Sequence, residues 1–288
     1  MKKDRKIQKS SLSKRRWEKF LRNKLAVIGL LVVILYIVLC FLAPVFTKFD
    51  PNGVSLMERS QPPSAAHLLG TDQVGRDLFT RLLYGGRISI LIGLCGALGG
   101  GLLGAVLGAC AGYFGGTLDK ILLKLCELFL SFPQTLLCLL LVVFLGQGTM
   151  NLFLIFTITG WTTTFRVVRS MFYSLKEESF VEACEAMGMK KSSIMFKHIF
   201  PNTLGPIIVN ITLYVAIYIL QEAALSFIGL GVPSTVPTWG NILNAAKDVT
   251  TVTNMPWLWI PPGLAISFFV LGVNFFGDGL RDVFDPHQ

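Results

Sequence analysis

The chain has 288 residues, of which 52% are hydrophobic and only 15% charged, and its mean hydropathy is +0.61. This composition is typical of an integral membrane protein and excludes a disordered chain or an ordinary water-soluble domain. The net charge of +9 does not indicate nucleic-acid binding, because eleven of the 26 Lys and Arg residues precede Leu25 and flank the first apolar stretch.

The first apolar stretch, residues 25–43, contains no charge and is long enough to cross about 30 Å of hydrocarbon. We expect a transmembrane helix over residues 25–46, and not a cleaved signal peptide, because the stretch is too long and further spans follow. Residues 1–24 form a basic cytoplasmic segment. Either residues 13–24 lie flat in the headgroup layer, or their charges only hold the N-terminus in the cytoplasm.

A polar loop with several Pro and Gly residues is predicted over residues 47–86. Within it, Asp72 and Arg76, and likewise Asp77 and Arg81, are spaced for ion pairs if this part is helical. His67 is a lone histidine, which we expect to be structural and not a metal ligand. On the residues alone, a loop that satisfies its own charges and folds over the mouth of the protein is the favoured interpretation.

The second predicted span, residues 88–114, has no charge in 27 residues and carries glycine at every fourth position. These glycines are Gly96, Gly100, Gly104, Gly108 and Gly112. In a helix they form a ridge without side chains, against which another helix backbone can pack closely. The pattern does not indicate a phosphate-binding loop, because the sequence contains no Gly-Lys dipeptide.

Four further spans are predicted, at residues 118–145, 149–165, 204–228 and 257–276. Pro133 is expected to kink the first of these. Arg166 and Arg169 are expected to end the next on the cytoplasmic side. Glu222 lies near the far end of the span 204–228, where an ionisable residue is a functional candidate unless water reaches it. The five spans after the loop form a core over residues 87–277, followed by a tail over residues 278–288.

Six spans place both termini on one side of the membrane. Twenty of the 26 Lys and Arg residues fall on that side and six on the other, so the termini and the loop 173–203 are predicted to be cytoplasmic.

The polar loop 176–201 predicts a pair of short amphipathic helices. The apolar residues of the first helix share one face at the spacing i, i+3, i+4 and i+7: Phe180, Ala183, Cys184 and Met187. Gly188 is expected to end this helix in the left-handed conformation. Ser192 or Ser193 is expected to cap the second helix, and Pro201 to limit its length. The apolar face predicts a docking surface for another protein.

The same loop resembles the "EAA" loop of ABC importer permeases. Glu182 and Ala183 begin the motif, Gly188 follows Cys184 by four residues, and Pro201 follows Gly188 by thirteen. The chain departs from the motif at three positions, Cys184, His198 and Phe200; the cysteine replaces one small residue by another, and the phenylalanine keeps an apolar residue.

Other stretches resemble the dipeptide, oligopeptide and nickel branch of that family. Residues 70–77 are similar to its "GTDxxGRD" signature, and the segment beginning at Glu222 is similar to its "EAxLSFLGLG" segment. The resemblance covers nearly the whole chain after the leader. It implies the type I importer fold, with six transmembrane helices and cytoplasmic coupling helices, in a bacterial plasma or inner membrane.

In that family two homologous permeases pair to form the path, two cytoplasmic ABC ATPases drive it, and an external binding protein delivers the substrate. The resemblance therefore implies no catalysis and no cofactor in this chain, with ATP and Mg in the ATPases. It assigns ATPase coupling to the following residues: Phe180, Glu182, Ala183, Cys184, Met187, Gly188, His198 and Pro201. It implies an external gate or a binding-protein contact for four others: Asp72, Arg76, Asp77 and Glu222.

Peptides are the expected substrate, with nickel or a metal chelate as the alternative. The three scattered His residues disfavour direct metal coordination but not passage of a chelate. An ion channel or secondary transporter remains a remote alternative, because the charges in the spans cluster near their ends and no internal repeat is evident. A membrane-embedded enzyme is disfavoured, because no nucleophile with its base lies in the spans.

Overall fold

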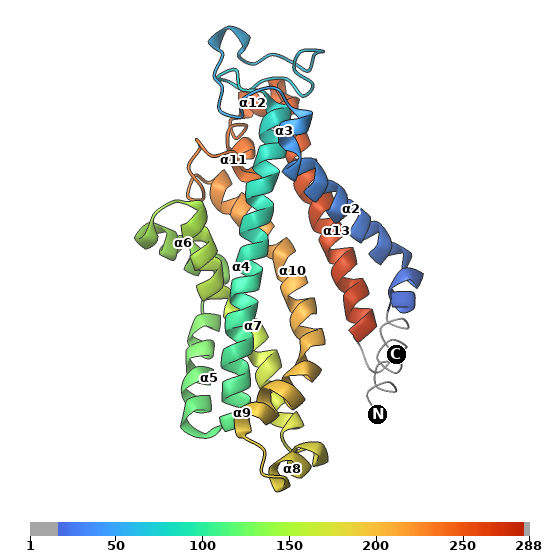
Figure 1. The fold of residues 1–288 in the computed structure, drawn as a ribbon. Coiled ribbons are helices and arrows are strands. Elements are labelled where there is room, and N and C mark those ends of the chain that lie inside the picture. Colours follow the sequence, from blue (N-terminus) through green and yellow to red (C-terminus); the bar gives the residue numbers. More distant parts are fainter. Residues whose placement is uncertain (1–16, 285–288) are drawn as a thin grey trace.

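The structure is a computed structural model, and it describes residues 17–284. The predicted all-α architecture is confirmed for this part of the chain, in which the single β-bridge, between Thr71 and Asp77, belongs to no strand. Figure 1 shows a long bundle with an irregular loop at one end and the short helix α8 at the other. Residues 1–16 of the predicted basic leader lie outside the described residues.

The helices follow one another along the chain as α2 (Lys24–Phe41), α3 (Ala43–Phe46), η1 (Leu56–Glu58), α4 (Leu78–Phe114), α5 (Gly116–Leu130), α6 (Gln134–Leu145), α7 (Thr149–Leu175), α8 (Ser179–Ala186), α9 (Lys191–Ser193), η2 (Ile194–Ile199), α10 (Phe200–Phe227), α11 (Trp239–Asn244), α12 (Val249–Asn254), η3 (Pro256–Leu258) and α13 (Ile260–Phe284).

Four helical stretches among the described residues are long and apolar enough to cross a membrane, and a bent pair is a fifth candidate. The four are Lys24–Phe41, Leu78–Phe114, Lys191–Phe227 and Pro256–Phe284. Helix α7 is also long enough, with 27 residues, but it is less apolar than these. The number of six spans therefore stays a prediction, and α7 is the span on which it depends.

The C-terminal part of the predicted external loop is helical. Helix α4 begins at Leu78, ten residues before the predicted span, because Asp77 caps it by accepting a hydrogen bond from the backbone N–H of Thr80 at 2.7 Å. Its 37 residues correspond to about 55 Å, so α4 extends beyond the hydrocarbon and connects the two ends of the molecule.

The predicted third span is not one kinked helix. Helices α5 and α6 are separate and bent by 91° at residues 131–133. Pro133 ends the run of helical hydrogen bonds, and its carbonyl accepts from the N–H groups of Leu136 and Leu137 as the next helix begins. The change of direction is therefore far larger than an ordinary proline kink.

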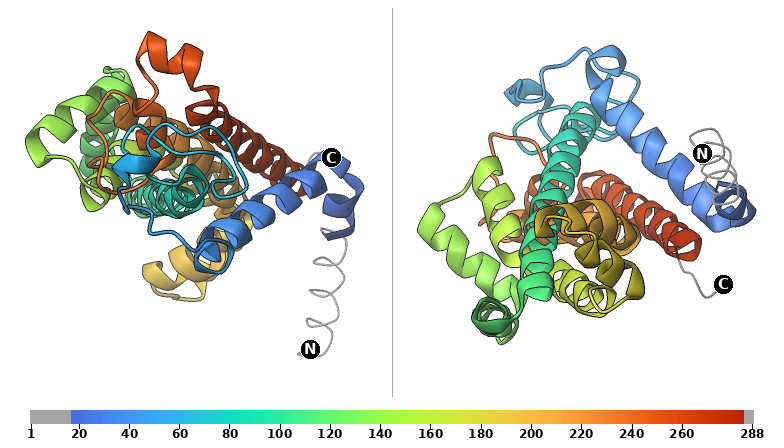
Figure 2. Two further views of the ribbon diagram at one scale, coloured as in Figure 1. Left: turned by 90° about the horizontal axis from the view of Figure 1, so that it is seen from above. Right: turned by 60° about the horizontal axis from the view of Figure 1, so that its bottom comes forward.

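Helices α2 and α13 form a pair that stands to one side of α4, α7 and α10 (Figure 2). Asn23, which caps α2, donates a hydrogen bond to Asp282 near the end of α13 at 3.0 Å. Close to this point the rings of Phe20 and Phe276 pack edge to face. The start of the first described span and the end of the last thus lie together.

The glycine ridge of α4 lies against α7, and this contact is the centre of the bundle. A Cβ atom built on Gly100 lies 3.1 Å from the carbonyl carbon of Gly160, and one on Gly108 lies 2.6 Å from the carbonyl oxygen of Phe165. These distances leave no room for side chains, so the two backbones are in direct contact. The ridge therefore packs within the chain and faces neither lipid nor a second subunit.

Candidate functional site

Helix α8 extends past the ends of the long helices, at the end of the molecule opposite the loop 47–77 (Figure 1). It begins after Glu178, whose backbone is extended, and carries Glu182 in its first turn. An acidic side chain there interacts favourably with the positive end of the helix dipole.

One face of α8 is buried against the bundle. Val181 is 1% exposed and Cys184 is 6% exposed, and both pack in a cluster with Phe172 of α7 and with Ile194 and Ile199 of η2. These contacts remove the apolar side chains from water and fix α8 to the ends of the long helices.

The outer face of α8 is exposed and partly apolar. Phe180 is 38% exposed and Met187 is 71% exposed, and Ala183 lies between them on the same stripe. The prediction for Cys184 was wrong, because it lies on the inner face with Val181 and cannot contact a partner in this structure. The surface formed by Phe180, Ala183 and Met187, together with exposed Glu182, is called the α8 surface below.

The predicted left-handed conformation of Gly188 is confirmed, with φ at +71°. Its N–H donates to the carbonyl of Glu185 at 2.8 Å, and the N–H of Met189 donates to the carbonyl of Cys184 at 3.2 Å. This pair of bonds is the Schellman motif, which ends a helix and turns the chain sharply.

The second predicted helix differs from expectation at both ends. It begins at Lys191 and has no side-chain cap, so neither Ser192 nor Ser193 caps it. Pro201 does not end it either, because a π-helical stretch, η2, leads directly into α10. Pro201 falls in the first turn of α10, where its missing N–H needs no partner within the helix.

Two residues of the predicted coupling set therefore lie at the start of a transmembrane helix. His198 is half-buried in η2, and its carbonyl accepts a hydrogen bond from the side chain of Asn202 at 2.8 Å. Pro201 is exposed. Side chains of η2 pack on α8, and η2 runs directly into α10.

At the opposite end, the loop 47–77 satisfies most of its own charges. Asp72 accepts from the Nε of Arg76 at 2.7 Å, but across a tight turn and not along a helix. Asp77 caps α4 and contacts the Nδ1 atom of His67 at 2.9 Å. The predicted pair with Arg81 is wrong, since Arg81 donates to the carbonyl of Pro51 at 2.8 Å.

Burial limits which of these loop residues can meet a partner. Asp72 and Asp77 are each 4% exposed, whereas the side chain of Arg76 is 20% exposed. The two carboxylates are thus occupied inside the loop, and of the three loop residues predicted to contact a gate or a partner only Arg76 reaches the surface.

The sequence left open whether water reaches Glu222. In the structure its side chain is completely buried and is not exposed to solvent. Its carboxylate accepts from the hydroxyl groups of Ser89 and Ser226, both at 2.7 Å. The hydroxyl oxygen of Ser89 also accepts from the backbone N–H of Trp239 at 3.2 Å. The network joins α4, α10 and α11, and contact with an external protein at Glu222 is excluded in this structure.

The partners of Glu222 could not be found from the sequence. Ser89 lies 133 residues from Glu222 along the chain, and Trp239 lies 150 residues from Ser89. A lone serine in an apolar span gives no local signal that it faces a carboxylate.

The long apolar helices, the irregular loop at one end and the short amphipathic helix at the other define a multi-pass α-helical membrane protein. Residues 102–288 match the family model described as "Binding-protein-dependent transport system inner membrane component", and residues 11–63 match "N-terminal TM domain of oligopeptide transport permease C". The chain belongs to this family of transport-system membrane components, as its sequence motifs predicted.

Curated relatives extend the similarity over nearly the whole chain. It is 40% identical to the oligopeptide transport system permease protein OppC of Bacillus subtilis over 284 residues, covering 98% of this chain and 92% of the relative. It is 39% identical to the dipeptide transport system permease protein DppC of Alkalihalophilus pseudofirmus, covering 92% and 86%. It is also 40% identical to OppC of Escherichia coli, covering 93% and 89%.

Proposed function

We propose that this chain is one permease subunit of an ATP-driven peptide importer and forms half of the translocation path. The observation that carries the proposal is the α8 surface, which presents Phe180 and Met187 at one end of a membrane-spanning bundle. Exposed large apolar side chains on a short helix beyond the membrane are typical of a surface that another protein covers.

The α8 surface is the proposed contact with a cytoplasmic ABC ATPase. Val181 and Cys184 hold α8 on the bundle, and Gly188 sets the angle at which the chain turns into η2 and α10. A movement of α8 therefore reaches α10 through packed side chains and through the continuous helical stretch Lys191–Phe227. ATP and Mg bind in the ATPases, and this chain contributes no catalytic group.

The proposed assembly contains a second, homologous permease, two ATPases and an external substrate-binding protein. Its proposed location is a bacterial plasma or inner membrane, with both termini and α8 on the cytoplasmic side. The excess of Lys and Arg on that side supports this orientation.

Small peptides are the proposed substrate. The oligopeptide and dipeptide permeases to which this chain is similar favour peptides over the nickel or metal-chelate alternative. A channel or a secondary transporter is disfavoured, because neither requires the α8 surface.

Purification from the native membrane tests the proposal. We expect the chain to copurify with a homologous permease and ABC ATPases, and the reconstituted complex to import a labelled peptide only with ATP and the binding protein. A matched variant, Phe180→Ser with Met187→Ser, should release the ATPases but keep the permease pair, because both side chains are exposed. Uptake of peptide without ATP, or uptake of nickel without uptake of peptide, would show that the proposal is wrong.

A further inference from the structure

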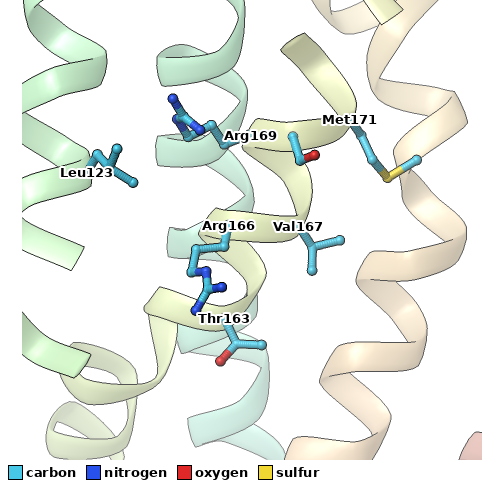
Figure 3. A pocket seen from close by; sticks show the side chains of 7 residues that line it. Leu123, Thr163, Arg166, Val167, Arg169 and Met171 are labelled. Carbon is cyan, nitrogen blue, oxygen red and sulfur yellow. The ribbon is translucent and has the colours of Figure 1, made fainter. Parts of the chain in front are cut away.

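An open-sided hollow of about 660 Å³ lies between α5 and α7, near the end of the molecule that carries α8. Figure 3 shows Leu123 of α5 on one side of it and the guanidinium groups of Arg166 and Arg169 reaching in from α7. Thr163 and Ser170 add hydroxyl groups to its lining. The volume falls in the range that holds small ligands.

Most residues that line the hollow lie on a different face of α7 from the one that packs on the glycine ridge, although the backbone of Arg169 meets Gly108 and Gly112. The residues of α7 in contact with the ridge include Trp161, Phe165 and Phe172, all of which are buried. Thr163, Arg166 and Ser170 follow a different stripe at the spacing i, i+3 and i+7, and none of the three is buried. This face of α7 is therefore partly polar, with Val167 and Met171 as its apolar members in the hollow.

The two arginines of the hollow differ in their partners. Arg169 forms two hydrogen bonds to the carboxylate of Asp119 on α5, of which the one from Nη2 is 2.6 Å long, so its charge is compensated. Arg166 is exposed, and its side chain makes no hydrogen bond or ion pair with any residue between 17 and 284. A free guanidinium thus projects into the hollow beside a compensated one.

The position of Arg166 along α7 places it near the predicted cytoplasmic end of the span. It lies 17 residues beyond the start of α7, or about 25 Å along the helix, so it is close to the far surface of a hydrocarbon layer of about 30 Å. A guanidinium at this level reaches water, so it needs no partner within the chain and is available to a ligand in the hollow. The hydrogen bond of 2.6 Å between Thr163 and Tyr214 continues the polar face onto α10.

We infer that this hollow is a carboxylate subsite on the wall of the translocation path, and that Arg166 binds the C-terminal carboxylate of the peptide as it passes. The inference rests on the proposed function. A guanidinium matches a carboxylate in planar, two-pronged geometry, and every unmodified peptide carries this group whatever its side chains. A subsite for it gives affinity without sequence selectivity, which suits a path that many peptides share.

The test compares one labelled peptide with its C-terminal amide in vesicles that contain the whole complex. Arg166→Gln should lower uptake of the free acid by about tenfold, as expected when about 1.4 kcal/mol of binding is lost, and leave uptake of the amide nearly unchanged. Arg166→Lys should restore part of the uptake. Lys124→Gln is the matched control, because it removes an exposed cation from α5 that does not line the hollow.

Chemical rescue gives a second measurement that does not need the amide. Arg166→Cys is made in a chain whose six native cysteines are replaced. Aminoethyl methanethiosulfonate then adds a positive charge, and the sulfonatoethyl reagent adds a negative one. Uptake of the free acid should recover with the first reagent and stay low with the second.

The outcomes separate this inference from the proposed function. If the unmutated complex imports no peptide, the proposed function itself fails. If it imports peptide but Arg166→Gln lowers acid and amide alike, or releases the second permease, Arg166 contacts another subunit and the inference is wrong. If the unmutated complex does not import the amide, the chemical rescue decides. Uptake of the free acid that recovers equally with both reagents, or that recovers with neither reagent, also shows that the inference is wrong.

Discussion

Replacing Gly188 by valine tests whether the turn after α8 sets the coupling geometry. Its φ of +71° is a conformation that costs a residue with a Cβ roughly 1–2 kcal/mol, and a β-branched side chain costs more. No atom lies within 4 Å of a Cβ built at this position, so the cost comes from the backbone alone and not from a clash.

That cost is large for so small a motif. The turn depends on two backbone hydrogen bonds, and α8 has only eight residues. A change of 1–2 kcal/mol shifts the population of the native turn by a factor of roughly 5–30. We therefore expect Gly188→Val to reach the membrane and pair normally, but to bind the ATPases weakly and to lose most peptide uptake.

The assay measures uptake and substrate-stimulated ATP hydrolysis in the reconstituted complex, normalised to permease content. Gly188→Asn should be mild, because asparagine tolerates the left-handed conformation, and Gly188→Ala should be intermediate. Gly229 is a matched control, since it has φ at +83° and equally open surroundings but follows α10 at the other end of that helix. Normal coupling in Gly188→Val, or equal loss of ATPase binding in Gly229→Val, would refute the reasoning.

Two further predictions concern packing and topology. Gly104→Ala should lower the free energy of unfolding of the purified subunit by about 1–3 kcal/mol, because the added Cβ meets the backbone of α7, including the N atom of Phe165 at 2.9 Å. Gly263→Ala, with no atom within 4 Å, should be neutral or slightly stabilising, and equal effects of the two would contradict direct backbone contact. With the native cysteines removed, a membrane-impermeant thiol reagent should label Ser64→Cys but not Ser192→Cys in intact cells; the reverse pattern would invert the predicted orientation.

Local signals in the sequence predicted much of the structure of this protein. The length of the apolar stretches located the long helices, and glycine at every fourth position indicated a helix face for close packing. The left-handed turn at Gly188 followed from the pattern of a helix stop, because such a conformation depends on the residue itself and its immediate neighbours. The distribution of Lys and Arg predicted the orientation for the same reason, since it needs no knowledge of which helices touch.

Contacts between distant segments decided the rest. Only the fold shows that the glycine ridge faces α7 and that Cys184 turns inward, because an amphipathic helix does not reveal from its sequence which side its own bundle covers. Pro201 could not be recognised as compatible with a continuing helix, since the preceding π-helical stretch places it in a first turn. Glu222 is buried and Arg166 is unpaired for a common reason: the partners of a charged group are chosen by tertiary packing, and no pattern of spacing records them.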